Sequence, residues 1–231
     1  MTMSPSELTY QTLRRAIGDQ TLRPGMKLPE DELGGHFGIS RTLVRTVLTR
    51  LRTSGLVDKQ EYRTATVSDY SLNDAVQTFR VFKALGREMI HGLHTSWSNA
   101  AETTLSQQVL KEQSAEAGGD IKVLNHFTSQ FFIQMAELAG NALIAQYIPD
   151  LVLRVSLVLA KHDEPLFTVF AFGDHEELVR SLQARNVEES ERLMEAHLAG
   201  IERRAISGYH RTKPVSLRAL LSGPAAASLA E

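Results

Sequence analysis

Apolar residues recur at helical spacing along most of this chain, and strand patterns are confined to one short stretch near the N-terminus. In that N-terminal part, the pattern predicts helices over residues 7–20, 30–37 and 40–54, followed by short strands at 56–59 and 65–68. Gly55 ends the third helix, and a polar turn joins the strands. Three helices followed by a hairpin predict a winged helix-turn-helix with a two-stranded wing.

Beyond residue 73 the strand signal almost disappears, which indicates an all-α bundle and makes the whole chain mainly α. The sequence therefore predicts a winged domain over residues 1–69, a helical domain over 70–208 and a poorly ordered tail over 209–231. The helical patterns of the second domain cover residues 74–97, 100–116, 121–139, 142–161, 165–184 and 187–207.

The third predicted helix carries the clearest chemical signal. Gly38-Ile39 forms a turn before it, and Ser40 is a natural N-cap. One face of this helix is apolar. In a helix-turn-helix, the second helix lies in the DNA major groove, where arginine can pair bidentately with guanine. The alternative is an ordinary helical hairpin with a solvated arginine face. The opposite, polar arc holds Arg41, Thr42, Arg45, Thr49 and Arg52.

Composition and charge fit this division. Residues 1–68 hold ten Lys and Arg against seven Asp and Glu, whereas the whole chain of 231 residues has a net charge of −2. A mildly basic module joined to an acidic one is typical of a DNA reader attached to a domain that does not touch DNA. The chain has no cysteine, which excludes disulfides and thiolate metal sites. We see no signal peptide and no run of about 20 apolar residues, so we expect a cytoplasmic protein without a membrane segment.

Specific motifs carry a resemblance to a known family. The run LRPGMKLPEDELGGHFGISRTLVRTVLTRLRTSGLV resembles the winged-helix domain of GntR-family bacterial transcription regulators. GNALIAQYIPDL and FGDHEELVRSLQARNVEESERLMEAHL resemble the later helices of the FCD-type effector domain found in the FadR branch. The resemblance implies that Arg41, Thr42 and Arg45 recognise DNA. It also implies a homodimer, a near-palindromic double-stranded operator and a small-molecule effector, most often a carboxylic acid.

Two departures from that family pattern concern the wing and the first helix of the helical domain. Thr64 stands where family members commonly have a glycine at the wing tip. A positive φ is unfavourable for a β-branched residue, so Thr64 implies a wing of different shape. The shape of the wing determines whether the neighbouring Arg63 reaches backbone phosphate or the minor groove. Phe82 and Gly86 replace an arginine and a glutamate that are usual in the family.

The third departure concerns metal. Domains of this type often bind a divalent ion through an aspartate, a histidine one turn later and two further histidines. His175 and His197 match the later two, but Thr128 and Phe132 occupy the aspartate and first histidine positions. A phenyl ring offers no lone pair, and two imidazoles alone make a weak site. A metal at His175 and His197 and a metal-free pocket lined by them both remain open, and no cofactor is certain.

The candidate effector residues are spread over the helical domain. Arg154 lies in an apolar helix, where it either clamps a carboxylate or occupies a solvated edge or dimer contact. Phe131 and Phe132 make the pocket apolar, which favours a fatty-acyl or aromatic acid as the effector. The predicted effector-binding set is Thr128, Phe132, Arg154, His175 and His197.

Three functions compete at this point. The leading hypothesis is a ligand-responsive transcription regulator, most simply a repressor. The second is a constitutive DNA-binding protein whose helical domain only dimerises. The third is a helical metal-dependent enzyme using His175 and His197, but the chain has no H-E-x-x-H, G-x-S-x-G or phosphate-binding glycine loop. We therefore expect no enzymatic activity.

Overall fold

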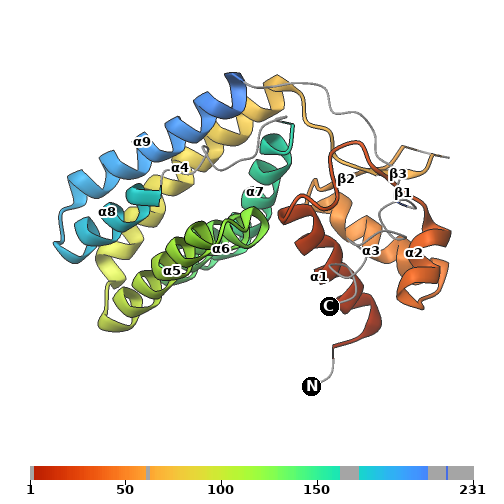
Figure 1. Ribbon diagram of the computed structural model, residues 1–231, viewed down its shortest axis with the longest axis horizontal. Coiled ribbons are helices and arrows are strands. Elements are labelled where there is room, and N and C mark those ends of the chain that lie inside the picture. The colour runs from red at the N-terminus through yellow and green to blue at the C-terminus, as the bar shows by residue number, and fades with distance from the viewer. Residues whose placement is uncertain (1–2, 61–62, 162–171, 208–216, 218–231) are drawn as a thin grey trace. The chain divides into compact units, whose positions relative to one another are not determined.

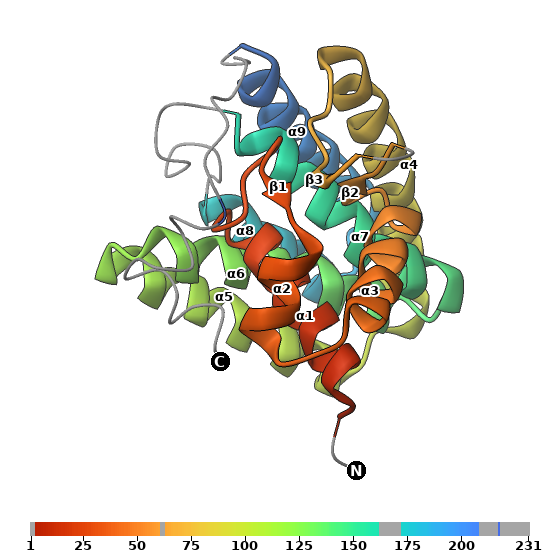
Figure 2. The ribbon, with the colours of Figure 1, turned by 90° about the vertical axis from the view of Figure 1, so that its right-hand side faces the viewer.

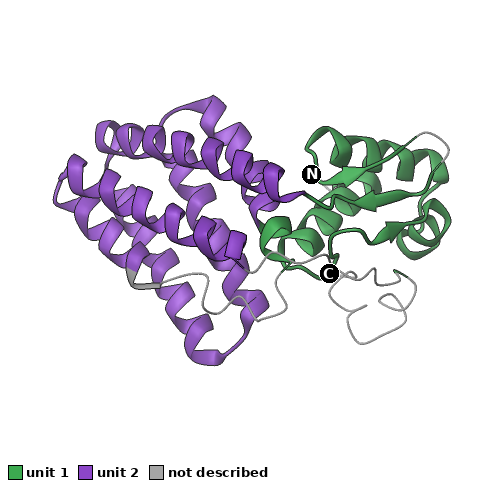
Figure 3. Ribbon diagram, turned by 90° about the horizontal axis from the view of Figure 1, so that it is seen from above, with its two compact units in different colours: residues 1–70, 156–161, 211–231 green, residues 71–155, 162–210 purple. Residues whose placement is uncertain are grey.

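The computed structural model describes residues 3–60, 63–161, 172–207 and 217. These residues divide into two compact units (Figure 3). Unit 1 contains residues 1–70, and unit 2 begins at Ser71. Residues 156–161, which the pattern assigns to the helical domain, group with unit 1. The predicted C-terminal tail lies outside the described residues apart from the buried Leu217.

Between residues 3 and 70, leaving out residues 61–62, unit 1 has three helices and a short sheet, which confirms the predicted winged helix-turn-helix (Figure 2). The strands form one antiparallel sheet in the order β1-β3-β2. The sequence pattern missed β1 because two residues are too short to show an alternation, and only the pairing of Lys27 with Thr66 and of Leu28 with Ala65 defines the strand. The elements are α1 (Pro5–Gly18), β1 (Lys27–Leu28), α2 (Glu30–Phe37), α3 (Arg41–Thr53), β2 (Val57–Asp58) and β3 (Ala65–Val67).

The connection between α2 and α3 is set by local chemistry. Gly38 ends α2 in the left-handed conformation with φ 64°, which costs a residue without a Cβ little. Ser40 then caps α3, its hydroxyl accepting a hydrogen bond from the Leu43 amide at 3.3 Å. The buried face of α3 completes the core of unit 1 through Val44, Val47, Leu48 and Leu51.

Unit 2 is helical throughout the part of the chain that the structure describes (Figure 1). Helix α4 packs along α9, and α5 packs against α6 and α8. The part of the predicted sixth helix that precedes Phe172 lies outside the described residues. The elements are α4 (Leu72–Ser96), α5 (Asn99–Gly118), α6 (Ile121–Leu138), α7 (Ala142–Leu159), α8 (Phe172–Gln183) and α9 (Val187–Ser207).

Two residues of α4 show how the interior of unit 2 is filled. Phe82 is buried and its ring lies 5.0 Å from that of Phe132, centroid to centroid. Gly86 lets α9 approach closely, since a Cβ at this position would stand 3.1 Å from Leu198 Cδ1. At the two positions where the family usually has charged side chains, this chain therefore uses an aromatic ring and a close helix contact.

Helix α7 is long and apolar enough to cross a membrane, whereas the sequence pattern predicted no such segment. Residues 142–159 have a mean hydropathy of 1.6, and half of that window is buried. The core helix of a soluble protein meets the same length and composition test, because burial on several sides also requires apolar residues all round. This helix is therefore weak evidence for a membrane segment.

Candidate DNA interface and interior ligand site

The polar arc predicted on α3 is exposed, and its opposite face is buried. Ser40 and the turn at Gly38 fix where this helix starts, which determines which side chains share the exposed arc. Helix α3 is the second helix of the helix-turn-helix, and it exposes arginine side chains from its first turn and from later turns. Contacts with bases and phosphates in a major groove require such side chains. The exposed residues are Arg41, Thr42, Arg45, Thr49 and Arg52.

Arg50 lies on α3 but outside this arc. Its Nη1 donates to Glu7 Oε2 at 2.7 Å, and its guanidinium lies 3.7 Å from the centroid of the Tyr10 ring. Both partners belong to α1, so this arginine ties α3 to α1 within unit 1. Its position agrees with the sequence analysis, which left it out of the DNA-binding set.

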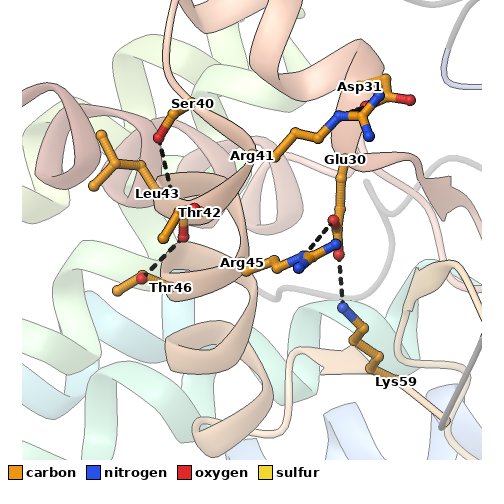
Figure 4. A network of polar contacts seen from close by, with 9 residues as sticks. All are labelled: Glu30, Asp31, Ser40, Arg41, Thr42, Leu43, Arg45, Thr46 and Lys59. Atoms are coloured by element: carbon orange, nitrogen blue, oxygen red, sulfur yellow. Dashed lines mark hydrogen bonds and ion pairs between the residues drawn. The ribbon is translucent and has the colours of Figure 1, made fainter.

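Acidic residues at the start of α2 contact the exposed arginines (Figure 4). Glu30 Oε2 accepts from Arg45 Nε at 2.7 Å, and its Oε1 accepts from Lys59 Nζ at 2.7 Å. Asp31 forms an ion pair with Arg41 Nε. Hydrogen bonds from Lys59 and then Arg45 lower the pKa of Glu30, so this carboxyl is ionised at neutral pH. The sequence analysis missed these partners; the acidic first turn of α2 was the available signal.

The wing is described only in part. Arg63 and Thr64 are exposed, and residues 61–62 lie outside the described residues. Thr64 does not adopt a positive φ, since Gln20 and Arg185 are the non-glycine residues with positive φ among those described. The wing thus reaches β3 without the strain that the sequence suggested, and the DNA contact by Arg63 stays a prediction.

A chain of hydrogen bonds runs from the interior of unit 2 to its surface, where the Asp174 side chain is 41% exposed. Glu112 Oε2 lies 2.9 Å from His175 Nδ1, and His175 Nε2 lies 3.1 Å from His197 Nε2. His197 Nδ1 lies 3.0 Å from Asp174 Oδ2. The four side chains come from α5, α8 and α9, and both histidines are at least 96% shielded from solvent, being 2% and 4% exposed. We call Glu112, Asp174, His175 and His197 the interior polar chain.

Aromatic rings of α6 pack on the two histidines of this chain. The Phe131 ring stacks on His175 with centroids 4.0 Å apart and an interplanar angle of 9°. Phe132 meets His175 edge-on at 5.4 Å and 86°, and lies 5.9 Å from His197. The rings shield the two histidines from water, which strengthens the hydrogen bond between them and makes a charge on either imidazole costly.

Burial determines the protonation of His197. Its removal from water lowers the pKa of His197 to about 4, outweighing the hydrogen bond with Asp174, which acts in the opposite direction. The same hydrogen bond lowers the pKa of Asp174. At neutral pH a neutral His197 therefore donates from Nδ1 to the Asp174 carboxylate, and its Nε2 can only accept from His175 Nε2.

These residues do not fit the four-ligand metal site that the family resemblance implies. Each histidine has a carboxylate on Nδ1, an arrangement usual behind metal-bound imidazoles. The first shell is incomplete, however, because Phe132 supplies a ring without a lone pair between the two histidines. The residues that the structure describes contain no group of three or more His, Cys, Asp or Glu side chains able to hold a metal ion.

The predicted effector residues separate into a cluster and an outlier. Phe132, His175 and His197 are in mutual contact, and Thr128 lies one turn before Phe132 on α6 with its buried hydroxyl unpaired in the structure. Arg154 lies half-buried on α7 and is not a member of the interior polar chain.

Two members of the interior polar chain were absent from the sequence prediction. Asp174 directly precedes His175, and that adjacency was the available signal. Glu112 gave none, because it is one glutamate on a polar helix, 63 residues from its partner.

A helix-turn-helix with an exposed arginine helix, joined to an all-α domain with a buried polar cluster, defines a DNA-binding transcription regulator of two domains. Comparison with known families specifies which one. Residues 5–67 match the model of the gntR family of bacterial regulatory proteins, and residues 77–200 match the FCD domain. The chain belongs to the GntR family, in its FCD-containing branch, and this is a family of transcription regulators, not enzymes.

Individual relatives agree with this assignment. The chain is 25% identical to the HTH-type transcriptional regulator LutR of Bacillus subtilis (strain 168), covering 84% of this chain and 97% of LutR. It is 25% identical to a probable D-xylose utilization operon transcriptional repressor of Paenarthrobacter nicotinovorans, covering 79% and 80%. Among solved structures, a GntR regulator from Rhodococcus sp. RHA1 has a TM-score of 0.80 at 19% identity, covering 90% and 100%. E. coli McbR/YncC has a TM-score of 0.76 at 19% identity, covering 89% and 97%. At these identities the two structures support the fold alone.

Proposed function

We propose that this protein is a ligand-responsive repressor that binds a near-palindromic operator as a homodimer in the cytoplasm. The observation that carries the proposal is the exposed arc of α3, which presents arginines from a capped helix start. A dimer would place two such helices in successive major grooves. It would also double the basic charge of residues 1–68. Repression is inferred from the name of the Paenarthrobacter relative, and occlusion of a promoter is its simplest mechanism.

Each residue of the arc has a role in this proposal. Arg41 and Arg45 read guanine through bidentate hydrogen bonds, and Thr42 contacts a base edge or phosphate at the helix start. Thr49 and Arg52, further along α3, bind phosphate and fix the register of the helix in the groove. Arg63 reaches backbone phosphate or the adjacent minor groove from the wing.

The effector in this proposal is a small carboxylic acid bound inside unit 2. Two buried oxygens support an occupant there, because Thr128 Oγ1 and Glu112 Oε1 have no protein partner in the structure, and buried polar groups are nearly always hydrogen-bonded. The phenyl rings favour an aromatic or fatty-acyl body. Arg154 lies outside this cluster on α7, so its pairing with the carboxylate requires an effector that extends beyond the cluster. Binding would change operator affinity through a coupling free energy of about 1–3 kcal/mol.

A constitutive regulator is the second candidate, and one observation favours it. His175 and His197 are almost fully shielded, and the rings of Phe131 and Phe132 pack directly on them. An effector could reach this cluster only if the surrounding helices moved apart. The constitutive alternative predicts that no small molecule changes operator affinity.

The test of DNA binding starts by selecting duplexes from a random library with the full-length protein. We expect enrichment of a near-palindrome. Arg45→Ala should reduce affinity for the selected duplex by at least about fivefold, since a bidentate arginine–guanine pair contributes ~1–3 kcal/mol of discrimination. Fluorescence anisotropy at physiological salt measures the affinities.

Arg192→Ala is the matched control, because Arg192 is equally exposed but lies on α9, paired with Glu189 at 2.7 Å. It should bind the selected duplex like the unaltered protein. Unchanged affinity of the Arg45→Ala protein would contradict the assignment of α3 as the recognition helix.

A further inference from the structure

Two neighbouring acidic residues at the start of α2 hold two arginines one turn apart on α3. Glu30 binds Arg45 and Asp31 binds Arg41 (Figure 4). In both pairs the carboxylate contacts Nε of the guanidinium. The acids thus bind the arginines at the nitrogen nearest the aliphatic stem, and from the same side of the helix-turn-helix.

This choice of nitrogen leaves the far end of each side chain available. A guanidinium has five N–H donors, and only one belongs to Nε. Among the residues that the structure describes, no hydrogen bond or ion pair uses the terminal nitrogens of Arg41 or Arg45. Nη1 and Nη2 can together pair with O6 and N7 of a guanine. The acids therefore restrain the stems without occupying the ends that would read bases.

The Glu30 contact is the better built of the two. The Glu30 side chain is 22% exposed, and both its oxygens are engaged, since Oε1 accepts from Lys59 beyond β2. One carboxylate therefore links α2, α3 and the wing strand. The Asp31–Arg41 pair is 65% and 69% exposed, in the range where an ion pair contributes little to stability.

We propose that Glu30, assisted by Asp31, is a specificity-determining residue that positions Arg45 and Arg41 for base readout. The proposal rests on DNA binding by α3. Holding the stems in advance reduces the side-chain entropy lost when the terminal nitrogens meet a base. The two negative charges also offset part of the attraction to phosphates, which is independent of sequence. Both effects favour the correct duplex over other DNA.

The experiment measures the ratio of two affinities. One probe is the duplex selected from a random library by the unaltered protein, and the other is a scrambled duplex of the same composition. Full-length Glu30→Gln and Asp31→Asn proteins are titrated against both by anisotropy at several salt concentrations. For Glu30→Gln we expect tighter binding to the scrambled duplex, and a fall of about fivefold to tenfold in the affinity ratio. For Asp31→Asn we expect a smaller fall.

Two further variants separate position from charge. Glu30→Asp keeps the charge but shortens the side chain, so its affinity ratio should fall while its affinity for the scrambled duplex stays unchanged. Glu7→Gln removes the same charge from an ion pair with Arg50, outside the exposed arc, and should keep the original ratio. Thermal unfolding verifies that each protein is folded. We expect all four variants to fold, because ion pairs near the surface contribute little to stability.

Each outcome decides the proposal. An unchanged ratio in Glu30→Gln, or equal losses for both duplexes, would overturn it while leaving sequence-specific DNA binding intact. A ratio in Glu30→Asp equal to that of the unaltered protein would overturn the positioning role. If the unaltered protein selects no sequence at all, the proposed function fails and this inference fails with it.

Discussion

His197 shows how the interior of unit 2 controls a single titrating group. Burial holds the pKa of His197 at about 4, whereas the unfolded chain has the ordinary value of 6.5. Between these values the unfolded state binds a proton that the folded state does not. The free energy of unfolding therefore decreases as pH falls from 6.5 to 4, and the histidine is neutral in both states above that window. The whole interval corresponds to about 3 kcal/mol.

Urea denaturation at pH 7, 5.5 and 4.5 measures this contribution. The His197→Asn protein should be less stable at pH 7, because His175 and Asp174 lose a partner, but its stability should depend less on pH below 6.5. Asn125→Ala removes a buried side chain of the same unit that does not titrate, and serves as the control, with the original pH dependence expected. Parallel pH curves for the unaltered and His197→Asn proteins would show that His197 is not the group responsible.

Residue positions set by local chemistry could be predicted from the sequence, and partners contributed by distant segments could not. Ser40 as a cap and the exposure of Arg45 follow from helical spacing alone. The partner of Arg45 is Glu30, 15 residues earlier on another helix, and Glu112 is 63 residues from His175. Those pairs depend on how the helices pack, which the periodicity of one helix does not encode.

At the scale of elements, the turn between α2 and α3 makes a prediction about glycine. A Cβ added at Gly35 or at Gly38 would meet no heavy atom within 4 Å, so both sites have room for alanine. They differ in backbone conformation, because Gly35 is helical and Gly38 has φ 64°. Gly38→Ala should destabilise unit 1 by about 1–2 kcal/mol, and Gly35→Ala should stabilise it by roughly 0.5–1 kcal/mol.

Amide hydrogen exchange across α2 and α3 measures these changes within unit 1, since the single tryptophan, Trp97, lies in unit 2 and reports on that unit. Gly38→Ala should speed exchange in both helices and weaken DNA binding, because the start of α3 moves. Equal exchange rates for the two alanine proteins would mean that the left-handed turn is not what fixes the register of α3.

The bounds of an element could be predicted where the element contains several repeats of its hydrophobic pattern. Helices α4 to α7 begin and end within two residues of the predicted bounds, because each contains several turns of a 3.6-residue pattern. Strand β1 has two residues and exists only through its pairing with β3, so no local pattern could indicate it. Helix α7 has a mean hydropathy of 1.6 over residues 142–159 although Asp150 and Arg154 interrupt the apolar run.

At the scale of the whole molecule, the order of the two units and their charges could be predicted, but the chemistry inside unit 2 could not. The charge asymmetry separates a basic reader from an acidic helical domain without any structural knowledge. The interior polar chain draws side chains from three helices, and phenyl rings of α6 pack on its two histidines. Only the packed structure shows that the two histidines point their Nε2 atoms at each other.

This arrangement predicts the response of the protein to divalent metal. Two imidazoles converge, but α6 presents Thr128 and Phe132 where a carboxylate and a third imidazole would complete a four-ligand set. We expect Zn²⁺ and Ni²⁺ to leave the melting temperature of the unaltered protein unchanged, and EDTA to have no effect. The double variant Thr128→Asp, Phe132→His supplies both missing ligands one turn apart on one helix. It should be less stable without metal, because it loses the Phe132 ring contacts, and should recover with metal.

For each protein, the melting temperature with metal is compared with the melting temperature without metal. The loss of stability caused by the substitutions themselves therefore cancels. A metal at 100 times its Kd stabilises the folded state by about 2.7 kcal/mol, which raises the melting temperature by roughly 5–10 °C for a chain of this length. Phe132→His alone adds one ligand and should respond weakly. An EDTA-reversible rise in the unaltered protein would show that His175 and His197 bind metal despite Phe132. Because their Nε2 atoms are hydrogen-bonded to each other, a metal could bind there only by breaking that contact, and an exchange study at the α8 and α9 amides would detect the change.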